Sequence, residues 1–264
     1  MRIPIMPEAK TKVVVVMPAY NAAQTLRMTY ADLPHDKVDL VILVDDGSSD
    51  ETARIARELG LELFVHNRNY GYGANQKTCY REALKAGAGI VVMVHPDYQY
   101  DPKLLPEVIR PIEEGRGDLV LGSRLLGGNP IRQGMPWWKY VGNRFLTWLE
   151  NRVFGLDLAE YHTGYRAFRK SALEGVNLET NSDNFIFDQE IIAQMVEQKA
   201  RIVEVPVPTR YFPEASSATL VQSSIYGLSI LWLLMRFTLH RSGIFRQRQF
   251  EGLRNRYASA ATKQ

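Results

Sequence analysis

Acidic side chains follow two apolar runs of this chain at the point where each run ends. Asp45 and Asp46 close the run at 38–44, and Asp97 follows the run at 90–94. Carboxylates that share one crevice repel each other unless a cation or hydrogen-bond donors lie between them. A metal ion bound to a diphosphate, together with ribose hydroxyls, would satisfy both groups. The sequence therefore predicts a nucleotide site between these two run ends.

The segment His95-Pro96-Asp97-Tyr98-Gln99 carries the predicted metal ligands. Asp97 and Gln99 offer oxygen atoms on an extended stretch. Mg²⁺ and Mn²⁺ prefer oxygen ligands from one or two carboxylates together with substrate phosphates. His95 has two interpretations, because an imidazole can bind Mn²⁺ or can orient the turn by hydrogen bonding. We therefore expect Mg²⁺ or Mn²⁺ on Asp97 and Gln99, with His95 as the third candidate ligand.

Further candidates for nucleotide binding lie at other turns. Pro18 and Tyr20 end the apolar run at 13–17, where the Tyr20 ring could stack on a base or pack in the core. Gly73 belongs to GYGANQKT at 71–78, which is similar to a phosphate loop but lacks its second glycine. Glycine permits close backbone approach before a helix N-terminus, so Gly73 is a candidate ligand contact.

Three arginines beside glycine- or proline-marked loops are candidates for phosphate binding: Arg124, Arg166 and Arg210. Guanidinium groups bind phosphate in a bidentate manner, although a single arginine more often forms a surface ion pair. Asp188 lies near an expected helix start. There it could serve as a general base or could complement the helix dipole.

The elements that would position these residues alternate along the chain. Apolar runs rich in β-branched residues, without polar alternation, are typical of parallel strands covered on both faces. They lie at 13–17, 38–44, 61–65, 90–94 and 118–121, with a later strand at 201–205. Helices are expected at 50–59, 74–86, 103–114, 140–154 and 184–199, and a long loop follows residue 122. In open α/β sheets ligands bind outside the carboxyl ends of the strands, so the candidates should share one edge.

The composition is that of an ordinary globular chain of 264 residues, 45% apolar and 23% charged. These values exclude a disordered, collagen-like or coiled-coil protein. No linker that would separate two independent domains is visible. The single cysteine, Cys79, excludes an internal disulfide. Together with the lack of a recognisable signal peptide, it favours a cytoplasmic location.

The positive charge is concentrated near the C-terminus. Residues 236–264 carry seven basic residues and one acidic residue, a net charge of +6, so the remainder of the +3 chain sums to −3. A nucleic-acid-binding domain usually carries its basic stripe on the fold itself, so no nucleic-acid partner is expected. The apolar stretch 225–239 would form about 22 Å of helix, short of the roughly 30 Å hydrocarbon core. It is expected to lie on an anionic membrane surface or, alternatively, to pack on the core.

Six motifs follow one another in a distinctive order: VVVVMPAYNAAQTL, VDDGSSDET, NRNYGYGANQKT, DLVLGSR, HTGYRAF and FDQEI. This order resembles that of family-2 glycosyltransferases with the GT-A fold. Within that group the chain is most similar to the dolichyl- and polyprenyl-phosphate mannose and glucose synthases, over residues 12–215. The resemblance implies an α/β fold, a single Rossmann-like GT-A domain with a mostly parallel central sheet. We place this domain at residues 1–220, followed by amphipathic, basic helices at 221–264.

The resemblance also implies a UDP- or GDP-sugar donor, a divalent metal and inversion at the anomeric carbon. By resemblance, Asp46 contacts the nucleotide, Asp97 and Gln99 match the metal-binding segment, and Arg124 faces the diphosphate or the acceptor phosphate. The mechanism expected is one in-line displacement, in which the metal and arginines stabilise charge on the leaving diphosphate. Its candidate catalytic residues are Asp97, Arg124 and Asp188.

Two positions depart from the family pattern. The D-x-D motif is His95-Pro96-Asp97 here, and the serine-lysine pair of lipid-phosphate synthases is Ser216-Ser217. The acceptor is expected to be a polyprenyl or dolichyl phosphate, already an anionic nucleophile. The alternative is a hydroxyl of a glycolipid or polysaccharide, which needs a base such as Asp188.

Two other classes of protein share features with this sequence. A nucleotidyltransferase is disfavoured because no glycine- and lysine-bearing loop follows the first run. A catalytically silent sugar-nucleotide-binding protein remains an alternative, because His95 replaces a carboxylate of the family motif. The expected location is peripheral, on the cytoplasmic face of a membrane, and the sequence leaves open whether the chain forms a homo-oligomer.

Overall fold

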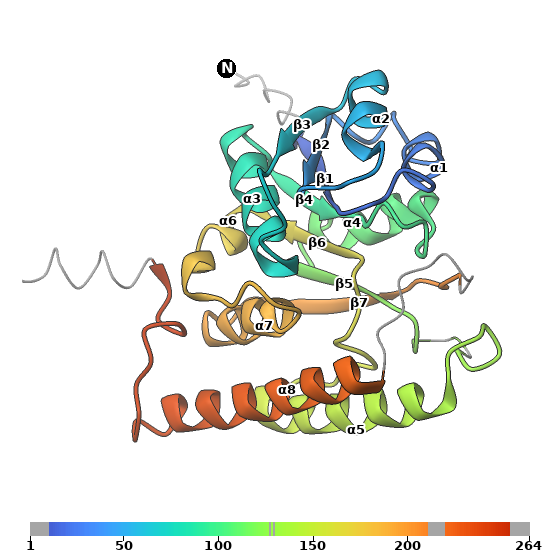
Figure 1. The fold of residues 1–264 in the computed structure, drawn as a ribbon. Coiled ribbons are helices and arrows are strands. Elements are labelled where there is room, and N and C mark those ends of the chain that lie inside the picture. Colours follow the sequence, from blue (N-terminus) through green and yellow to red (C-terminus); the bar gives the residue numbers. More distant parts are fainter. Residues whose placement is uncertain (1–10, 127, 129, 211–219, 254–264) are drawn as a thin grey trace, which may run out of the picture.

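A computed structural model describes residues 11–126, 128, 130–210 and 220–253. Its centre is a seven-stranded sheet in the order β3-β2-β1-β4-β6-β5-β7 (Figure 1). The strands are β1 (Val13–Ala19), β2 (Leu40–Asp45), β3 (Glu62–Val65), β4 (Ile90–Met93), β5 (Leu119–Ser123), β6 (Arg166–Arg169) and β7 (Ile202–Pro206). Only β6 runs antiparallel to its neighbours in this sheet, β4 and β5. The expected α/β fold with a mostly parallel sheet is confirmed.

The apolar runs of the sequence form strands because both faces of the sheet are covered. In β1, Val14 and Val16 belong to the core on one face, whereas Val13 and Val15 belong to the core on the other. Burial on both faces removes the polar alternation of a half-exposed strand. The six strands expected from apolar runs are present.

Strand β6 was not predicted. It has only four residues, Arg166–Arg169, with an arginine at each end, so it lacks the apolar character of a buried strand. Each arginine has a carboxylate partner, since Arg166 pairs with Asp188 and Arg169 with Asp118. Tertiary ion pairs therefore allow this polar sequence to lie inside the sheet.

Helices cover both faces. They are α1 (Leu26–Ala31), α2 (Thr52–Glu58), α3 (Tyr72–Lys85), α4 (Leu105–Glu113), α5 (Trp137–Phe154), α6 (Lys170–Leu173), α7 (Phe187–Glu197) and α8 (Leu220–Arg241), with short 3₁₀ turns at Pro102–Leu104 and Leu178–Thr180. The short helix α1 was not predicted. Helix α3 begins two residues before its expected start, which places Gly73 inside its first turn.

Helix α8 belongs to the same core as the sheet. Leu233, Leu234 and Phe237 on its inner face are buried with residues of α3 and α7, and Phe250 folds back onto Phe237. The helix also contacts α5, and the two lie side by side along one edge of the molecule (Figure 1). Of the two interpretations of the apolar stretch 225–239, core packing therefore holds for the inner face. Within the described ranges, no helix has the length and apolar character needed to cross a membrane.

Candidate active site

The carboxyl ends of β1 and β2 lie side by side, with Ala19 of β1 paired to Asp45 of β2. Beyond them, the two following turns are tied together. The Asn21 backbone N–H donates to Ser48 Oγ over 2.8 Å, and Asn21 Oδ1 accepts from the Ser49 backbone N–H over 2.9 Å. These bonds hold two of the motifs at one edge of the sheet.

The candidates at this edge differ in exposure. Pro18 is buried inside β1, where it pairs with Val44, so it shapes the strand end. Tyr20 is 54% exposed, and its ring therefore does not pack in the core. The side chain of Asp45 is buried and accepts a hydrogen bond from the Ser48 hydroxyl. Tyr20 keeps the exposed ring that stacking on a base would need.

Asp46 organises the turn between β3 and α3. Its Oδ1 accepts from the Tyr70 backbone N–H over 3.0 Å and lies 2.7 Å from His66 Nδ1, and its Oδ2 accepts from the Gly71 N–H over 2.9 Å. Three donors of the chain itself therefore hold this buried carboxylate. The expected contact of Asp46 with the nucleotide stays a prediction, and the turn at 66–71 is what Asp46 visibly positions.

Gly73 serves close packing inside the protein. Its N–H donates to Asp183 O over 2.7 Å. A Cβ at this position would collide with Ser182 O and lie 2.9 Å from Phe187 Cβ. The glycine is needed because the segment before α7 crosses directly over α3, which is a different reason from the phosphate approach expected from the sequence.

The segment after β4 presents Asp97 beside the edge. Asp97 is partly exposed, and its Oδ1 accepts from the Gln99 backbone N–H over 3.1 Å. Gln99 O in turn accepts from the Arg210 backbone N–H over 2.8 Å. The Arg210 guanidinium lies 4.5 Å above the Tyr98 ring and pairs with Asp101 over 2.9 Å. Arg210 is thus brought next to the predicted metal segment.

His95 lies between Tyr72 and Gly164. Its ring stacks on Tyr72 at a centroid distance of 5.7 Å, and Nε2 is 3.4 Å from the Tyr72 hydroxyl. A Cβ on Gly164 would come within 2.7 Å of the His95 ring, so only glycine permits this approach. Burial lowers the pKa of His95, against the opposing charges of Asp97 and Asp188. This environment favours the neutral imidazole.

Asp188 and Arg166 form a buried ion pair close to His95. Arg166 Nη1 lies 2.5 Å from Asp188 Oδ1, and the Arg166 side chain is 1% exposed. The Tyr72 hydroxyl donates to Asp188 Oδ2 over 2.8 Å, and Gln76 Nε2 donates to Oδ1 over 3.2 Å. Burial disfavours the charged form of Arg166, but Asp188 and the nearby tyrosines, Tyr72 first among them, together outweigh burial and raise the pKa of Arg166. Both carboxylate oxygens of Asp188 are therefore occupied by donors of the protein.

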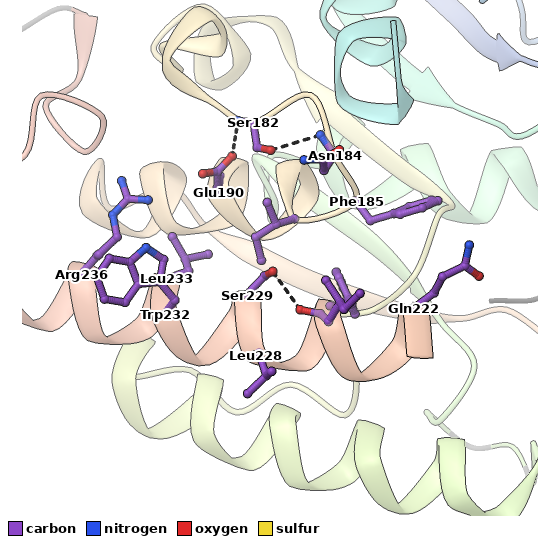
Figure 2. Close-up of a pocket in the computed structure, with 13 residues that line it drawn as sticks. Ser182, Asn184, Phe185, Glu190, Gln222, Leu228, Ser229, Trp232, Leu233 and Arg236 are labelled. Atoms are coloured by element: carbon purple, nitrogen blue, oxygen red, sulfur yellow. Dashed lines mark hydrogen bonds between the residues drawn. The ribbon is translucent and has the colours of Figure 1, made fainter. Parts of the chain in front are cut away.

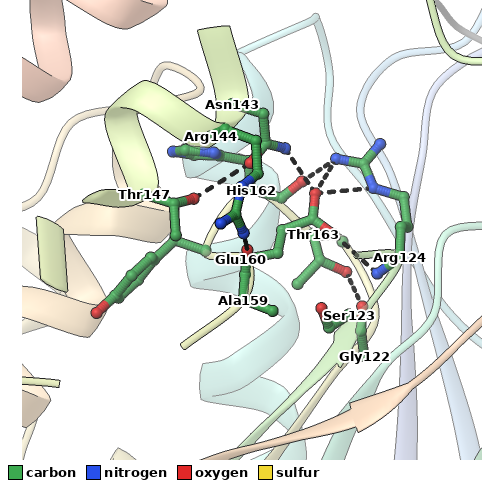
Figure 3. A network of polar contacts seen from close by, with 12 residues as sticks. Gly122, Ser123, Arg124, Asn143, Arg144, Thr147, Ala159, Glu160, His162 and Thr163 are labelled. Atoms are coloured by element: carbon green, nitrogen blue, oxygen red, sulfur yellow. Dashed lines mark hydrogen bonds and ion pairs between the residues drawn. The ribbon is translucent and has the colours of Figure 1, made fainter. Parts of the chain in front are cut away.

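Arg124 follows β5 and is held by Glu160 (Figure 3). Its Nε donates to Glu160 Oε1 over 2.9 Å, and its backbone N–H donates to Oε2 over 2.8 Å. Its Nη2 also donates to His162 O over 2.7 Å. Gly164, which contacts His95, lies two residues further along the same segment. The segment 160–164 thus links Arg124 to the His95 environment.

Polar residues of α5 support that segment from the other side. Asn143 Nδ2 donates to Glu160 Oε1 over 2.7 Å (Figure 3). Glu150 Oε2 lies 2.9 Å from His162 Nε2. Asn143, Thr147 and Glu150 are all buried. Sequence reasoning missed them, although their i, i+4, i+7 spacing marks one helix face. It also missed Tyr72, Gln76 and Glu160, for which only the fold supplies partners.

The candidates thus form two connected groups. Tyr20, Asp45, Asp46, His95 and Asp97 gather along the ends of β1, β2 and β4, whereas Arg166 and Asp188 lie buried close to His95. Among the described residues, no group of three or more His, Cys, Asp or Glu side chains could hold a metal ion. The pair Ser216-Ser217 lies outside the described residues.

The strand order of the sheet, and the loops that gather at the carboxyl ends of its strands, define a GT-A glycosyltransferase fold. The chain belongs to glycosyl transferase family 2, whose family model matches residues 14–176. Among solved structures, it is similar to glucosyl-3-phosphoglycerate synthase from Mycobacterium tuberculosis in complex with UDP. The TM-score is 0.68 at 18% identity, covering 88% of this chain and 81% of that one.

Relatives with related names are found among curated proteins. UDP-N-acetylglucosamine–dolichyl-phosphate N-acetylglucosaminyltransferase from Methanococcus voltae is 29% identical over 214 residues, 75% of this chain and 85% of the relative. Polyprenol monophosphomannose synthase from Mycolicibacterium smegmatis is 26% identical over 204 residues, 74% of this chain and 76% of the relative. Undecaprenyl-phosphate mannosyltransferase from Micrococcus luteus is 28% identical over 208 residues, 74% of this chain and 82% of the relative. The family expected from the six motifs is confirmed.

Proposed function

We propose that this glycosyltransferase moves a hexose, with inversion, from a UDP- or GDP-sugar to a polyprenyl or dolichyl phosphate. The observation that carries the choice of acceptor is the state of Asp188. Its two oxygens are occupied by Arg166, Tyr72 and Gln76, so it is poorly placed to take a proton from a hydroxyl acceptor. A lipid phosphate is already anionic and needs no general base. The names of the relatives support the same acceptor class.

The donor would lie along the ends of β1, β2 and β4. The exposed Tyr20 ring would stack on the base, as aromatic rings do on bases. The turn at 66–71, which Asp46 holds, would line the nucleoside. Asp45 and Asp46 would then contact the nucleotide through hydrogen bonds that its ribose hydroxyls donate.

A divalent cation fits the segment 95–99. Asp97 contributes a partly exposed carboxylate, the hard oxygen ligand that Mg²⁺ and Mn²⁺ prefer. The neutral His95 ring suits Mn²⁺ as an additional ligand, and Gln99 offers an amide oxygen. When bound, the cation would supply charge stabilisation for the leaving diphosphate. The M. tuberculosis synthase has been crystallised with Mn²⁺ and UDP, which supports the use of a divalent metal in this fold.

The chain's own residues have distinct parts in the displacement. Arg124 would exchange contacts with Glu160 for a phosphate oxygen, and Arg210 would face the same ligand from the other side. Arg166 would act indirectly, because its buried side chain pairs with Asp188, which in turn accepts from the Tyr72 hydroxyl. Fixed charges of this kind stabilise the transition state without reorganising during the reaction.

We further propose that the enzyme lies on the anionic cytoplasmic face of a membrane. Helices α5 and α8 expose apolar side chains along adjacent faces: Trp137, Val141, Phe145 and Trp148 on α5, and Val221, Leu228, Leu231 and Met235 on α8. Exposed basic residues border them, among them Arg144, Arg152 and Arg241. Apolar insertion with a basic rim is the pattern of interfacial binding. The role expected for residues 225–239 is thereby extended to α5.

A donor panel tests the function. UDP- and GDP-sugars are incubated with undecaprenyl phosphate and Mg²⁺ or Mn²⁺, and the lipid product is identified by mass spectrometry. We expect one sugar to be transferred to the phosphate, and Asp97→Ala to reduce the product strongly. Transfer to a hydroxyl acceptor without any lipid-phosphate product would overturn the proposal. Sugar-nucleotide binding without transfer to either acceptor would indicate a silent binding protein.

A further inference from the structure

A groove of about 680 Å³ lies between α8 and the segment that leads into α7 (Figure 2). One wall is formed by Phe185 and Ile186, and the other by Ile225, Ser229 and Trp232 of α8. Its volume lies in the range of ligand sites. Three apolar side chains along the groove are exposed to solvent: Phe185, Ile225 and Trp232 are 56%, 61% and 59% exposed.

One end of the groove reaches the candidate active site. The Phe185 ring lies 4.7 Å from the Tyr72 ring, centroid to centroid. Tyr72 in turn donates to Asp188 and stacks on His95. Figure 2 shows Phe185 and Gln222 near one end, with Trp232 and Arg236 at the other. A molecule extended along α8 would therefore begin one aromatic ring away from the reacting groups.

Three polar side chains of the groove already have partners inside the protein. Glu190 Oε2 accepts from the Ser182 backbone N–H over 2.6 Å, and the Ser229 hydroxyl donates to Ile225 O over 2.9 Å. Arg236 Nε donates to Gln247 Oε1 over 2.7 Å, so its guanidinium is directed toward the segment that follows α8. Because these polar groups are already hydrogen-bonded, a ligand would gain most binding free energy by covering the apolar walls. The groove therefore favours an elongated apolar ligand.

We propose that this groove binds the isoprenoid chain of the acceptor, with the phosphate at the Phe185 end. The proposal rests on the proposed function, because it assumes a lipid-phosphate acceptor. The argument for this occupant is continuity, since the apolar walls lead directly to Tyr72 and His95. A helix of another protein would have no reason to end at the reacting groups.

Two acceptors of different length test the position of the chain. Geranyl phosphate has two isoprene units and would reach only the Phe185 end, whereas undecaprenyl phosphate has eleven and would pass Trp232. Both are assayed in detergent micelles, so that attachment to a membrane does not enter the result. We expect Trp232→Ala to raise KM for undecaprenyl phosphate about tenfold with kcat unchanged, as for an interaction equal in ground and transition states. KM for geranyl phosphate should change less than about twofold, while Phe185→Ala should raise KM for both.

The matched control is Ile244→Ala, just beyond the end of α8 and outside the groove, where the side chain is also exposed. It should leave KM for both acceptors unchanged. Equal effects of Trp232→Ala and Ile244→Ala would show a general contact with the detergent micelle, and would overturn the groove. An increase in KM caused by Trp232→Ala that is the same for both acceptors would also overturn the groove.

Photocrosslinking separates this proposal from the proposed function. A long-chain polyprenyl phosphate with a photoreactive group in its isoprenoid part is irradiated with the protein, and the labelled peptides are identified. Labelling at 182–190 and 222–236 supports the groove even if no sugar is transferred. Active transfer with labels elsewhere overturns the groove and leaves the function intact.

Discussion

Glu160 binds both the guanidinium and the backbone N–H of Arg124, with Nε–Oε1 at 2.9 Å and N–Oε2 at 2.8 Å. The carboxylate is fully buried, and Asn143 of α5 donates to it as well. This arrangement fixes the direction of Arg124 at the end of β5. It also offsets the charge of Arg124.

A double-mutant cycle tests whether Glu160 acts through Arg124. We expect Arg124→Met to lower kcat/KM by about 100-fold, as for loss of one charge-stabilising donor. Glu160→Gln keeps an acceptor oxygen but removes the charge, and should lower kcat/KM about tenfold. The double variant should be no slower than Arg124→Met alone, because the second change has nothing left to orient. Multiplicative losses would contradict this coupling.

The Arg166–Asp188 pair should be required for stability. Asp188→Asn leaves a buried guanidinium without its counter-charge, which typically costs about 3–5 kcal/mol. A thermal unfolding experiment should show a clearly lower Tm. Asp183→Asn is the control, because the Asp183 side chain is 59% exposed and its pair with Lys77 should contribute less than about 1 kcal/mol. An unchanged Tm for Asp188→Asn would show that the pair is not structural.

Donor binding should depend on Asp46, and turnover on Asp97. Asp46→Asn disturbs the carboxylate that accepts from Tyr70 and Gly71, so calorimetry should record weaker nucleotide binding. Asp97→Ala should lower the initial rate about 100-fold or more, because charge stabilisation of the leaving group is lost. Near-wild-type binding and rates in both variants would refute these assignments.

Metal use should not depend on His95. Turnover should require Mg²⁺ or Mn²⁺ and should cease in excess EDTA, because Asp97 and the diphosphate oxygens offer hard ligands. His95→Asp, which restores the family motif, should retain or raise activity. Gly164→Ala should lower activity instead, since its Cβ would come within 2.7 Å of the His95 ring. Full activity in EDTA would refute the metal proposal.

Membrane attachment should depend on both α5 and α8. Trp148→Glu and Leu231→Glu replace exposed apolar side chains, and each should weaken flotation with anionic liposomes. Added salt should weaken binding of the wild type without abolishing it, because only the charge contribution is screened. Val65→Glu, exposed at the end of β3, is the control. Point variants are preferable to truncation before Val221, because removing α8 would expose core partners of Phe237.

If Trp148→Glu and Leu231→Glu both float like the wild type, the exposed faces of α5 and α8 do not bind membrane. Equal loss with Val65→Glu would instead indicate an unspecific effect of added negative charge.

The sequence by itself determined the alternation of strands and helices and the family. The apolar runs at 13–17 and 90–94 contain no alternating polar residues. Such short runs are stable mainly as strands that are covered on both faces of a sheet. Parallel strands place their carboxyl ends at one edge, so the gathering of Tyr20, Asp45 and Asp97 also followed from local patterns. These features depend on periodicity and chain direction, which a sequence contains.

Only the tertiary structure decided which partner each polar residue takes. Glu160 is separated from Arg124 by 36 positions, and Asp188 from Tyr72 by 116, so no local pattern pairs them. The four-residue strand β6 is likewise stable only because Asp118 and Asp188 neutralise its arginines. The same holds for α8, whose apolar stretch is compatible with a membrane surface or a core. Its inner face is buried because the rest of the fold supplies a matching apolar surface, and burial is a property of that pairing rather than of either segment alone.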